Sequence, residues 1–280
     1  MNVEEFLDLF IRELELNKSL RNYYRLMDSS SSFAFRKAYL HQRLSYVDRF
    51  VTKGGSAIWD IGCGYANTAL YLTLKGHRVN GTTLEYYYDQ IQQRMEYWSR
   101  IGNLDKLSIV YQDLFDTSFP PASFDYIILQ DTLHHLEPLD KALHMIESAL
   151  AHDGKLIVSE ENGRNLFISL KNYIKRGNKR VIEYHDGKLN KTLLLGNENV
   201  RTYECWTQEL KKAGLAIEDG HTQYIRLFPP FMIRKVNYQS VITREQKLWK
   251  KSPCLKNHCF FGINFTARKT CQGSKDLAAS

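Results

Sequence analysis

The chain has few cysteines, and their spacing excludes the sites that cysteines most often build. Its 280 residues include five, an odd number with no C-x-x-C pair: Cys63, Cys205, Cys254, Cys259 and Cys271. A disulfide framework and a structural zinc site are therefore not expected. We predict no metal site and a reducing, cytoplasmic setting.

Long hydrophobic runs are also missing. None approaches the ~20 residues that a membrane-spanning helix needs. The first segment does not resemble a secretory signal, because Glu4, Glu5 and Asp8 interrupt its apolar positions. The helical spacing of those apolar positions instead predicts an amphipathic helix over residues 3–16.

Positive charge is concentrated in two segments. Residues 164–191 contain eight Lys/Arg and two acids, and residues 226–256 contain eight Lys/Arg and one acid, although the net charge of the chain is only +7. Three interpretations stay open: solvated surface, recognition of an anionic substrate, or peripheral docking on an anionic membrane surface or an acidic carrier protein. The sequence does not indicate an oligomeric state.

Strand and helix patterns alternate through the middle of the chain. Strands are predicted at 57–59, 77–83, 107–111, 124–129 and 155–159, with helices at 66–75, 86–101 and 138–151. Repeated units of this length indicate an α/β fold with a mostly parallel sheet and helices on both faces.

The alternation is interrupted twice after the fifth strand. The interruptions cover 162–199 and 226–257, with a helix at 203–213 and strands at 215–225 and 260–267. We therefore predict N-terminal lid helices over 1–52, linked by Ser29–Ser32. These helices are followed by a domain over 53–270 that contains the two insertions, and then by a flexible tail over 271–280.

The segment Ile58–Ala66 (IWDIGCGYA) carries the main functional signal. A strand that enters a glycine turn and then a helix creates a crevice at the carboxyl end of the sheet. The glycines allow a ligand to approach the backbone, and Asp60 can pair with a ligand ammonium. A phosphate loop fits poorly, because Asn67 stands where G-x-G-x-x-G has its third glycine and no Gly-Lys-Ser/Thr follows.

These residues resemble the first motif, D-x-G-x-G, of the class I S-adenosylmethionine-dependent methyltransferases. Residues 55–160 carry further matching segments in the family's order: Val79–Glu85, Tyr111–Leu114, Phe124–Gln130 and Asp131–Leu136. The resemblance implies a Rossmann-like sheet of seven strands, S-adenosyl-L-methionine as cofactor and S-adenosyl-L-homocysteine as product.

The resemblance also implies the cofactor-binding residues. Asp60 would anchor the amino-acid end beside the loop Gly62, Cys63 and Gly64. The adenine edge would contact Gln112, Asp113 and Leu114. Gln130, at the end of the fourth strand, is also predicted to contact the cofactor. At the position where the family has an acid that contacts the ribose, this chain has Thr83. The ribose contact could therefore be Glu85, Thr83 or Tyr88. We favour Glu85, because a carboxylate can accept hydrogen bonds from both ribose hydroxyls.

His134 and His135 stand where an acceptor would approach the methyl group. Either imidazole could remove a proton from a hydroxyl or amine, or could simply pack the turn. The HHL segment is similar to that of many small-molecule methyltransferases and lacks the Glu-His pair of cyclopropanating relatives. We therefore predict methyl transfer to oxygen, nitrogen or carbon of a small-molecule acceptor.

Two other functions remain as alternatives. One is a non-catalytic cofactor-binding module, and the other is an RNA or DNA methyltransferase that uses the basic insertions as a phosphate track. The second is disfavoured, because no N/D-P-P-Y/F element follows strand four. Aromatic residues flanking the core are further candidates for lining an acceptor pocket: Tyr23, Tyr24, Phe33, Phe35, Tyr39, Tyr173, Tyr184, Tyr203, Trp206 and Tyr224.

Overall fold

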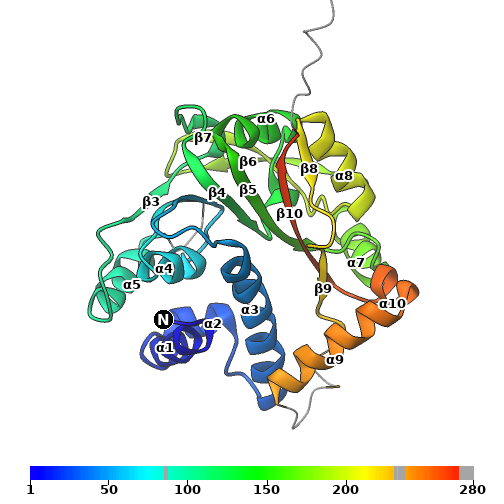
Figure 1. The fold of residues 1–280 in the computed structure, drawn as a ribbon, viewed down its shortest axis with the longest axis horizontal. Coiled ribbons are helices and arrows are strands. Elements are labelled where there is room, and N and C mark those ends of the chain that lie inside the picture. Colours follow the sequence, from blue (N-terminus) through cyan, green and yellow to red (C-terminus); the bar gives the residue numbers. More distant parts are fainter. Residues whose placement is uncertain (85–87, 230–231, 233–236, 271–280) are drawn as a thin grey trace, which may run out of the picture.

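A mostly parallel sheet forms the centre of the computed structural model, which describes residues 1–84, 88–229, 232 and 237–270 (Figure 1). The strand order is β3-β2-β1-β4-β5-β10-β8, and β9 also pairs with β10. Pairing is parallel from β3 to β5, whereas β10 runs antiparallel to β5, β8 and β9. The strands of this sheet are β1 (Ala57–Ile61), β2 (Arg78–Thr83), β3 (Leu107–Tyr111), β4 (Phe124–Gln130), β5 (Leu150–Glu161), β8 (Leu215–Ile217), β9 (Gln223–Ile225) and β10 (Gly262–Lys269).

Helices cover both faces of the sheet, as predicted. The α-helices are α1 (Val3–Leu16), α2 (Lys18–Tyr24), α3 (Ser30–Phe50), α4 (Asn67–Leu74), α5 (Gln90–Ser99), α6 (Leu139–Ala149), α7 (Leu166–Arg176), α8 (Tyr203–Lys212), α9 (Tyr238–Lys251) and α10 (Pro253–His258). Two short 3-10 turns, η1 (Leu114–Asp116) and η2 (Leu133–His135), follow β3 and β4. None of the described helices combines the length and apolar character of a membrane span.

The two sides of each central strand supply two separate cores. Ile58 of β1 and Ile128 of β4 pack with α1, α3, α4 and α5. Their neighbours Trp59 and Ile127 face the other way and pack with α6 and α8. All five residues of β1 are buried. This two-sided burial explains why these strands are short apolar runs and do not alternate with polar residues.

The sheet confirms the predicted α/β class, with one difference. The predicted strand over residues 215–225 is two strands, because β8 ends at Ile217 and β9 begins at Gln223. Gly220 lies between them with a φ of +76°, a turn conformation that a continuous strand does not contain. Both short strands pair with β10, so the sheet has eight strands and not seven.

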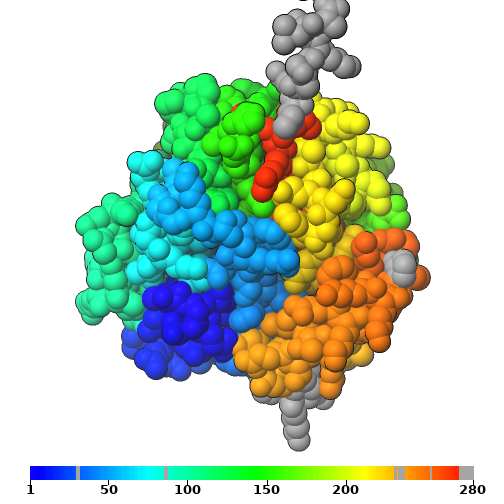
Figure 2. All heavy atoms as spheres, in the orientation of Figure 1, coloured from blue at the N-terminus to red at the C-terminus, as the bar shows by residue number. Residues whose placement is uncertain are grey.

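The two basic insertions have distinct structures. The first contains α7 and an antiparallel hairpin of β6 (Val181–Asp186) and β7 (Lys191–Gly196). The second contains α9 and α10, and α9 packs against α3 through a small cluster that includes Ala38 and Val241. In the space-filling view, α9 accordingly continues the surface formed by the N-terminal helices (Figure 2).

The N-terminal helices differ from the prediction at one point. Ser29–Ser32 is not a linker, because the Ser29 side chain caps α3 by accepting a hydrogen bond from the backbone N–H of Ser32 at 3.1 Å. Helix α3 therefore begins at Ser30 and includes most of the segment that was predicted to be a linker. The predicted tail over 271–280 lies outside the described residues.

Candidate functional site

A cavity of about 630 Å³ opens at the carboxyl ends of β1, β2 and β4. Helices α1, α2 and α3 contribute to its wall, and the β6–β7 hairpin contributes from the other side. Most of the predicted site residues line it: Asp60, Gly62, Cys63, Gly64, Thr83, Gln112, Asp113, Leu114, Gln130 and His135. His134 does not, and Glu85 lies outside the described residues.

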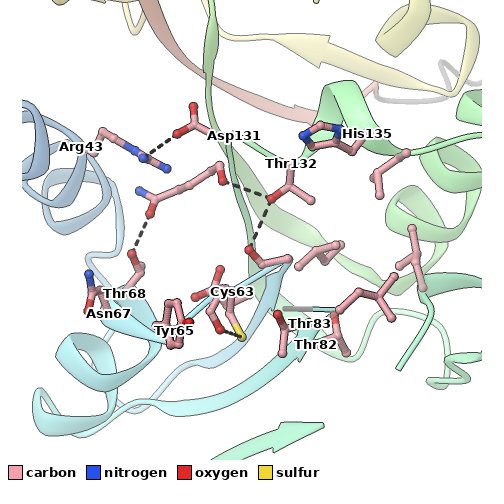
Figure 3. A pocket seen from close by; sticks show the side chains of 18 of the residues that line it. Arg43, Cys63, Tyr65, Asn67, Thr68, Thr82, Thr83, Asp131, Thr132 and His135 are labelled. Carbon is pink, nitrogen blue, oxygen red and sulfur yellow. Dashed lines mark hydrogen bonds and ion pairs between the residues drawn. The ribbon is translucent and has the colours of Figure 1, made fainter. Parts of the chain in front are cut away.

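The glycine loop gives one wall of the cavity an exposed backbone. Gly62 has a φ of +66°, and a Cβ atom there would lie 2.4 Å from the side chain of Thr132. Only glycine fits this position without displacing the turn after β4. The loop therefore lies close against that turn and leaves its other side open to a ligand (Figure 3).

Asp60 is a carboxylate that lines the cavity while being almost completely buried. Its side chain is 2% exposed, and Oδ2 has no hydrogen-bond partner among the described residues. Burial raises the pKa of this carboxyl to about 7, against the opposing charge of Arg43. A buried carboxylate oxygen without a partner is costly, so the site suits a ligand that brings a positive charge to it.

The turn after β4 contributes a second charged group that sequence reasoning missed. Asp131 has a φ of +53° and accepts hydrogen bonds from Tyr39 Oη at 2.8 Å and from an Arg43 guanidinium nitrogen at 2.7 Å (Figure 3). Gln130 accepts from Thr68 Oγ1 at 2.7 Å. Arg43 lines the cavity from α3. No motif surrounds Arg43, so only the folded chain reveals its position.

The acid after β3 is held by the hairpin. Asp113 Oδ2 lies 2.6 Å from Lys191 Nζ, and the same ammonium lies 2.8 Å from Asp116 Oδ1. A neighbouring ion pair joins Lys188 to Asp89 at 2.9 Å. These pairs fasten the β6–β7 hairpin to the side of the cavity where the adenine edge was predicted.

Of the three candidates for the ribose contact, Thr83 and Tyr88 lie among the residues that the structure describes. Thr83 lines the cavity at the end of β2, whereas Tyr88 is not among its lining residues. The Tyr88 hydroxyl donates to the backbone carbonyl of Ile109 at 3.0 Å. This contact leaves Thr83 as the described candidate beside Glu85.

The two predicted histidines occupy different environments. His134 is 3% exposed, and its Nδ1 lies 2.5 Å from Glu160 Oε2. Burial alone would lower its pKa, but the Glu160 carboxylate raises it to about 9. His135 lines the cavity and places Nδ1 2.9 Å from the carbonyl oxygen of Gly196. Burial, and then the charge of His134, lower the pKa of His135.

A buried ion pair supports the glycine loop from below. The guanidinium of Arg94 binds both carboxylate oxygens of Glu13, at 2.8 and 2.7 Å, and also donates to the carbonyl oxygen of Tyr65 and to Asn67 Oδ1. Trp98 Nε1 donates to the same carboxylate at 2.9 Å. Helix α1 is thereby joined through α5 to the backbone that follows Gly64.

Three of the aromatic candidates line the cavity. Tyr23 and Tyr24 reach it from α2, and Tyr184 reaches it from the hairpin. The others are not among the lining residues: Phe33, Phe35, Tyr39, Tyr173, Tyr203, Trp206 and Tyr224.

Comparison with known proteins agrees with this geometry. Residues 59–158 match a family model described as a methyltransferase domain. The chain is 27% identical over 113 residues to (S)-coclaurine N-methyltransferase of Thalictrum flavum, covering 40% of this chain and 31% of that protein. It is 23% identical over 152 residues to ubiquinone biosynthesis O-methyltransferase of Chromobacterium violaceum, covering 54% and 64%. The chain thus spans less than two thirds of either curated relative.

A solved structure shows the same fold. Phosphoethanolamine N-methyltransferase 2 of Haemonchus contortus, in complex with S-adenosyl-L-methionine, superposes with a TM-score of 0.53 at 18% identity, covering 89% of this chain and 60% of that one. Residues 59–158 thus match a methyltransferase domain, and the chain shares its fold with a methyltransferase that was solved in complex with S-adenosyl-L-methionine.

The cofactor of this family fits the residues present. S-adenosylmethionine carries an ammonium on its methionine end, and Asp60 Oδ2 is a buried acceptor without a partner. At Gly64 no atom lies within 4 Å of the place that a Cβ would occupy, so a ligand can approach the backbone of the loop there. The cavity volume also falls within the ~300–1,000 Å³ range of small-molecule sites.

Proposed function

We propose that the chain transfers a methyl group from S-adenosylmethionine to a small-molecule acceptor by in-line displacement. The observation that carries this proposal is the buried Asp60 carboxylate beside the glycine loop, whose Oδ2 has no hydrogen-bond partner among the described residues. Asp60 would hold the amino-acid end of the cofactor and Asp113 its adenine edge, with Thr83 or Glu85 at the ribose. When bound, the cofactor supplies a methyl group already activated by the sulfonium.

The chain's own residues then have two tasks, to align the acceptor and to remove its proton. The methyl carbon leaves sulfur as its bond to the acceptor atom forms, and the proton of an O–H or N–H acceptor needs a base. We infer that His135 is this base. Gly196 offers only a carbonyl oxygen, so Nδ1 of His135 carries the proton and Nε2 is the acceptor.

His134 suits a structural role better than a catalytic one. Its pKa of about 9 keeps the ring protonated near neutral pH, so it cannot accept a further proton. The Glu160 carboxylate that holds His134 also accepts the backbone N–H of Leu133 at 2.7 Å. We infer that this pair fixes the η2 turn and thereby positions His135.

The names of two relatives and the aromatic lining of the cavity support a small-molecule acceptor. One curated relative is named as an N-methyltransferase and the other as an O-methyltransferase, and both names indicate small-molecule acceptors. Tyr23, Tyr24 and Tyr184 give this chain an aromatic contribution to the cavity wall. Incubating a cell extract with the protein and isotopically labelled cofactor, followed by mass spectrometry, would identify the acceptor and the methylated atom.

Calorimetric titration with S-adenosylmethionine tests the central claim. Binding by the wild type, together with label transfer to a small molecule, supports the proposal. Binding without transfer would favour the non-catalytic module. Transfer to added RNA or DNA would favour the nucleic-acid methyltransferase, and no binding would overturn the assignment.

Replacing His135 with alanine is expected to lower kcat for the labelled product by about 10²- to 10⁴-fold, the usual contribution of a general base. Cofactor affinity should stay within a few-fold of wild type. The pH dependence of kcat should also lose its limb below neutrality, since a neutral imidazole is no longer required. His144→Ala, which removes an exposed histidine of α6, is the matched control. A loss of less than tenfold would show that His135 only positions the acceptor.

A further inference from the structure

Helix α7 carries an apolar face that the described part of the chain leaves largely uncovered, with one ring contact at its beginning between Phe167 and Phe261 (centroids 6.5 Å apart). Its large apolar residues are all strongly exposed: Leu166 (69%), Phe167 (71%), Leu170 (59%), Tyr173 (58%) and Ile174 (75%). At 100° per residue these five positions fall within an arc of about 120°, so they form one continuous side of the helix. Such a face normally packs on a core or on a partner.

The opposite side of α7 attaches the helix to the protein. Within α7 only Ile168 and Asn172 are buried, four residues apart on one stripe. Asn165, which caps the helix, donates to the carbonyl oxygen of Cys259 at 3.0 Å. The apolar face therefore points directly away from the molecule, at a periphery distant from α1 and α2 (Figure 1).

Positive charge flanks this apolar face on both sides. In projection, Lys171 lies about 40° beyond one edge of the arc and Arg176 about 60° beyond the other, while Lys175 lies further round toward the buried side. Lys179 and Arg180 follow the helix, and residues 164–182 contain no acid. None of these five cations makes an ion pair with a described residue.

We propose that α7 docks on an anionic lipid surface, with its apolar face in the acyl–headgroup boundary and its cations at the headgroups. An apolar stripe bordered by Lys and Arg is the pattern of helices that lie in a membrane interface. A second copy of the chain fits less well, because a symmetric contact would place this uncompensated positive segment against itself. The helix also carries no acidic residue to meet a basic protein partner.

The docking face is continuous in sequence with one wall of the cavity. The hairpin that follows α7 exposes Tyr184 (46%) and Leu194 (44%), and both residues also line the cavity. Docking through α7 would therefore anchor to the lipid the same segment of the chain that carries this wall. An acceptor with an apolar tail could then be taken up from the bilayer; this last step rests on the proposed function, whereas the docking does not.

Vesicle sedimentation tests the docking directly, without an assay for methyl transfer. The full chain is expected to sediment with vesicles of equimolar phosphatidylcholine and phosphatidylglycerol, to bind phosphatidylcholine vesicles much less, and to lose affinity as sodium chloride is raised. Ile174→Asp and Leu170→Asp should each weaken binding by about tenfold or more, because each places a charge in the apolar boundary. Lys175→Gln with Arg176→Gln should weaken binding to the anionic vesicles alone.

Leu16→Asp is the matched control, because Leu16 is equally exposed (78%) but lies at the end of α1. It should bind vesicles as the wild type does, and all variants should keep the wild-type melting temperature. The proposal is overturned if the wild-type protein does not sediment with anionic vesicles. It is also overturned if the Ile174→Asp variant binds them with wild-type affinity. Concentration-dependent dimerisation that Ile174→Asp abolishes, without vesicle binding, would assign the face to a second copy.

Discussion

Replacing Asp60 with alanine is expected to weaken S-adenosylmethionine binding by at least about thirtyfold. Truncating one partner of a buried, hydrogen-bonded charge pair costs about 2–5 kcal/mol, and the ligand ammonium would be the partner that loses its counter-charge. The effect should be large because the carboxylate is 2% exposed and water cannot replace it. Isothermal titration calorimetry of wild type and variant measures the difference.

The affinity should also depend on pH in a direction set by Asp60. Its pKa in the free protein is raised to about 7 by burial, so the carboxyl is increasingly protonated as the pH falls below neutrality. A cation binds the ionised form, and affinity should therefore fall by up to about tenfold per pH unit below 7 and level off above it. Asp60→Asn should bind weakly at every pH and lose this dependence.

Asp153→Asn provides the control, since Asp153 is a fully exposed carboxylate on the protein surface. It should match the wild type in both affinity and pH dependence. Wild-type affinity in Asp60→Ala would show that the amino-acid end of the cofactor is held elsewhere, with Arg43 and Asp131 as the nearest charged alternatives.

The substitution Glu13→Gln should lower the free energy of unfolding by about 3–5 kcal/mol. Glu13 and Arg94 are 2% and 1% exposed, and removing one charge leaves the other buried without compensation. A loss of this size is a large part of the total stability of an ordinary domain. Urea denaturation followed by circular dichroism gives the difference in midpoint and slope.

Two further variants separate the charge from the packing. Glu15→Gln changes an exposed acid two residues along α1 and should cost less than about 0.5 kcal/mol. Glu13→Met combined with Arg94→Met replaces the pair with apolar side chains and should recover much of the stability. Its cofactor affinity should nevertheless stay reduced, because Tyr65 and Asn67 lose the guanidinium that holds them. A Glu13→Gln protein as stable as the wild type would show that the ion pair is not required.

The parts of the molecule that could be predicted from the sequence are those set by local pattern. Apolar runs ending at polar residues located β1 and β4, and the alternation of strands and helices located β2. The parallel arrangement then placed Asp60, Thr83 and Gln130 at one edge of the sheet. The Gly62–Gly64 turn is equally local, because a positive φ and a close approach to Thr132 both require glycine at position 62.

The parts that could not be predicted depend on contacts between distant segments. Arg43 meets Asp131 across 88 positions, and Glu13 meets Arg94 across 81. No local pattern predicts such a pairing, because Glu13, Arg43 and Arg94 are locally only charged positions on helices and Asp131 is only a polar residue after a strand. The same reasoning applies to α7, which lies in a segment that the sequence analysis describes only as a basic interruption; that its apolar face points outward depends on how the whole chain folds.

Two elements that wall the cavity, α1 and the β6–β7 hairpin, are held by ion pairs. Dissolved salt is expected to weaken only the ion pairs of the hairpin. Helix α1 is fastened through Glu13 and Arg94, whose almost complete burial keeps mobile ions away from the pair. The hairpin is fastened through Lys188 and Lys191, whose ion pairs are partly exposed and are therefore weakened by mobile ions. We expect the ligand to enter and leave when the hairpin moves away from the cavity while α1 stays in place. The rate of turnover should therefore depend on ionic strength, whereas the stability of the fold should not.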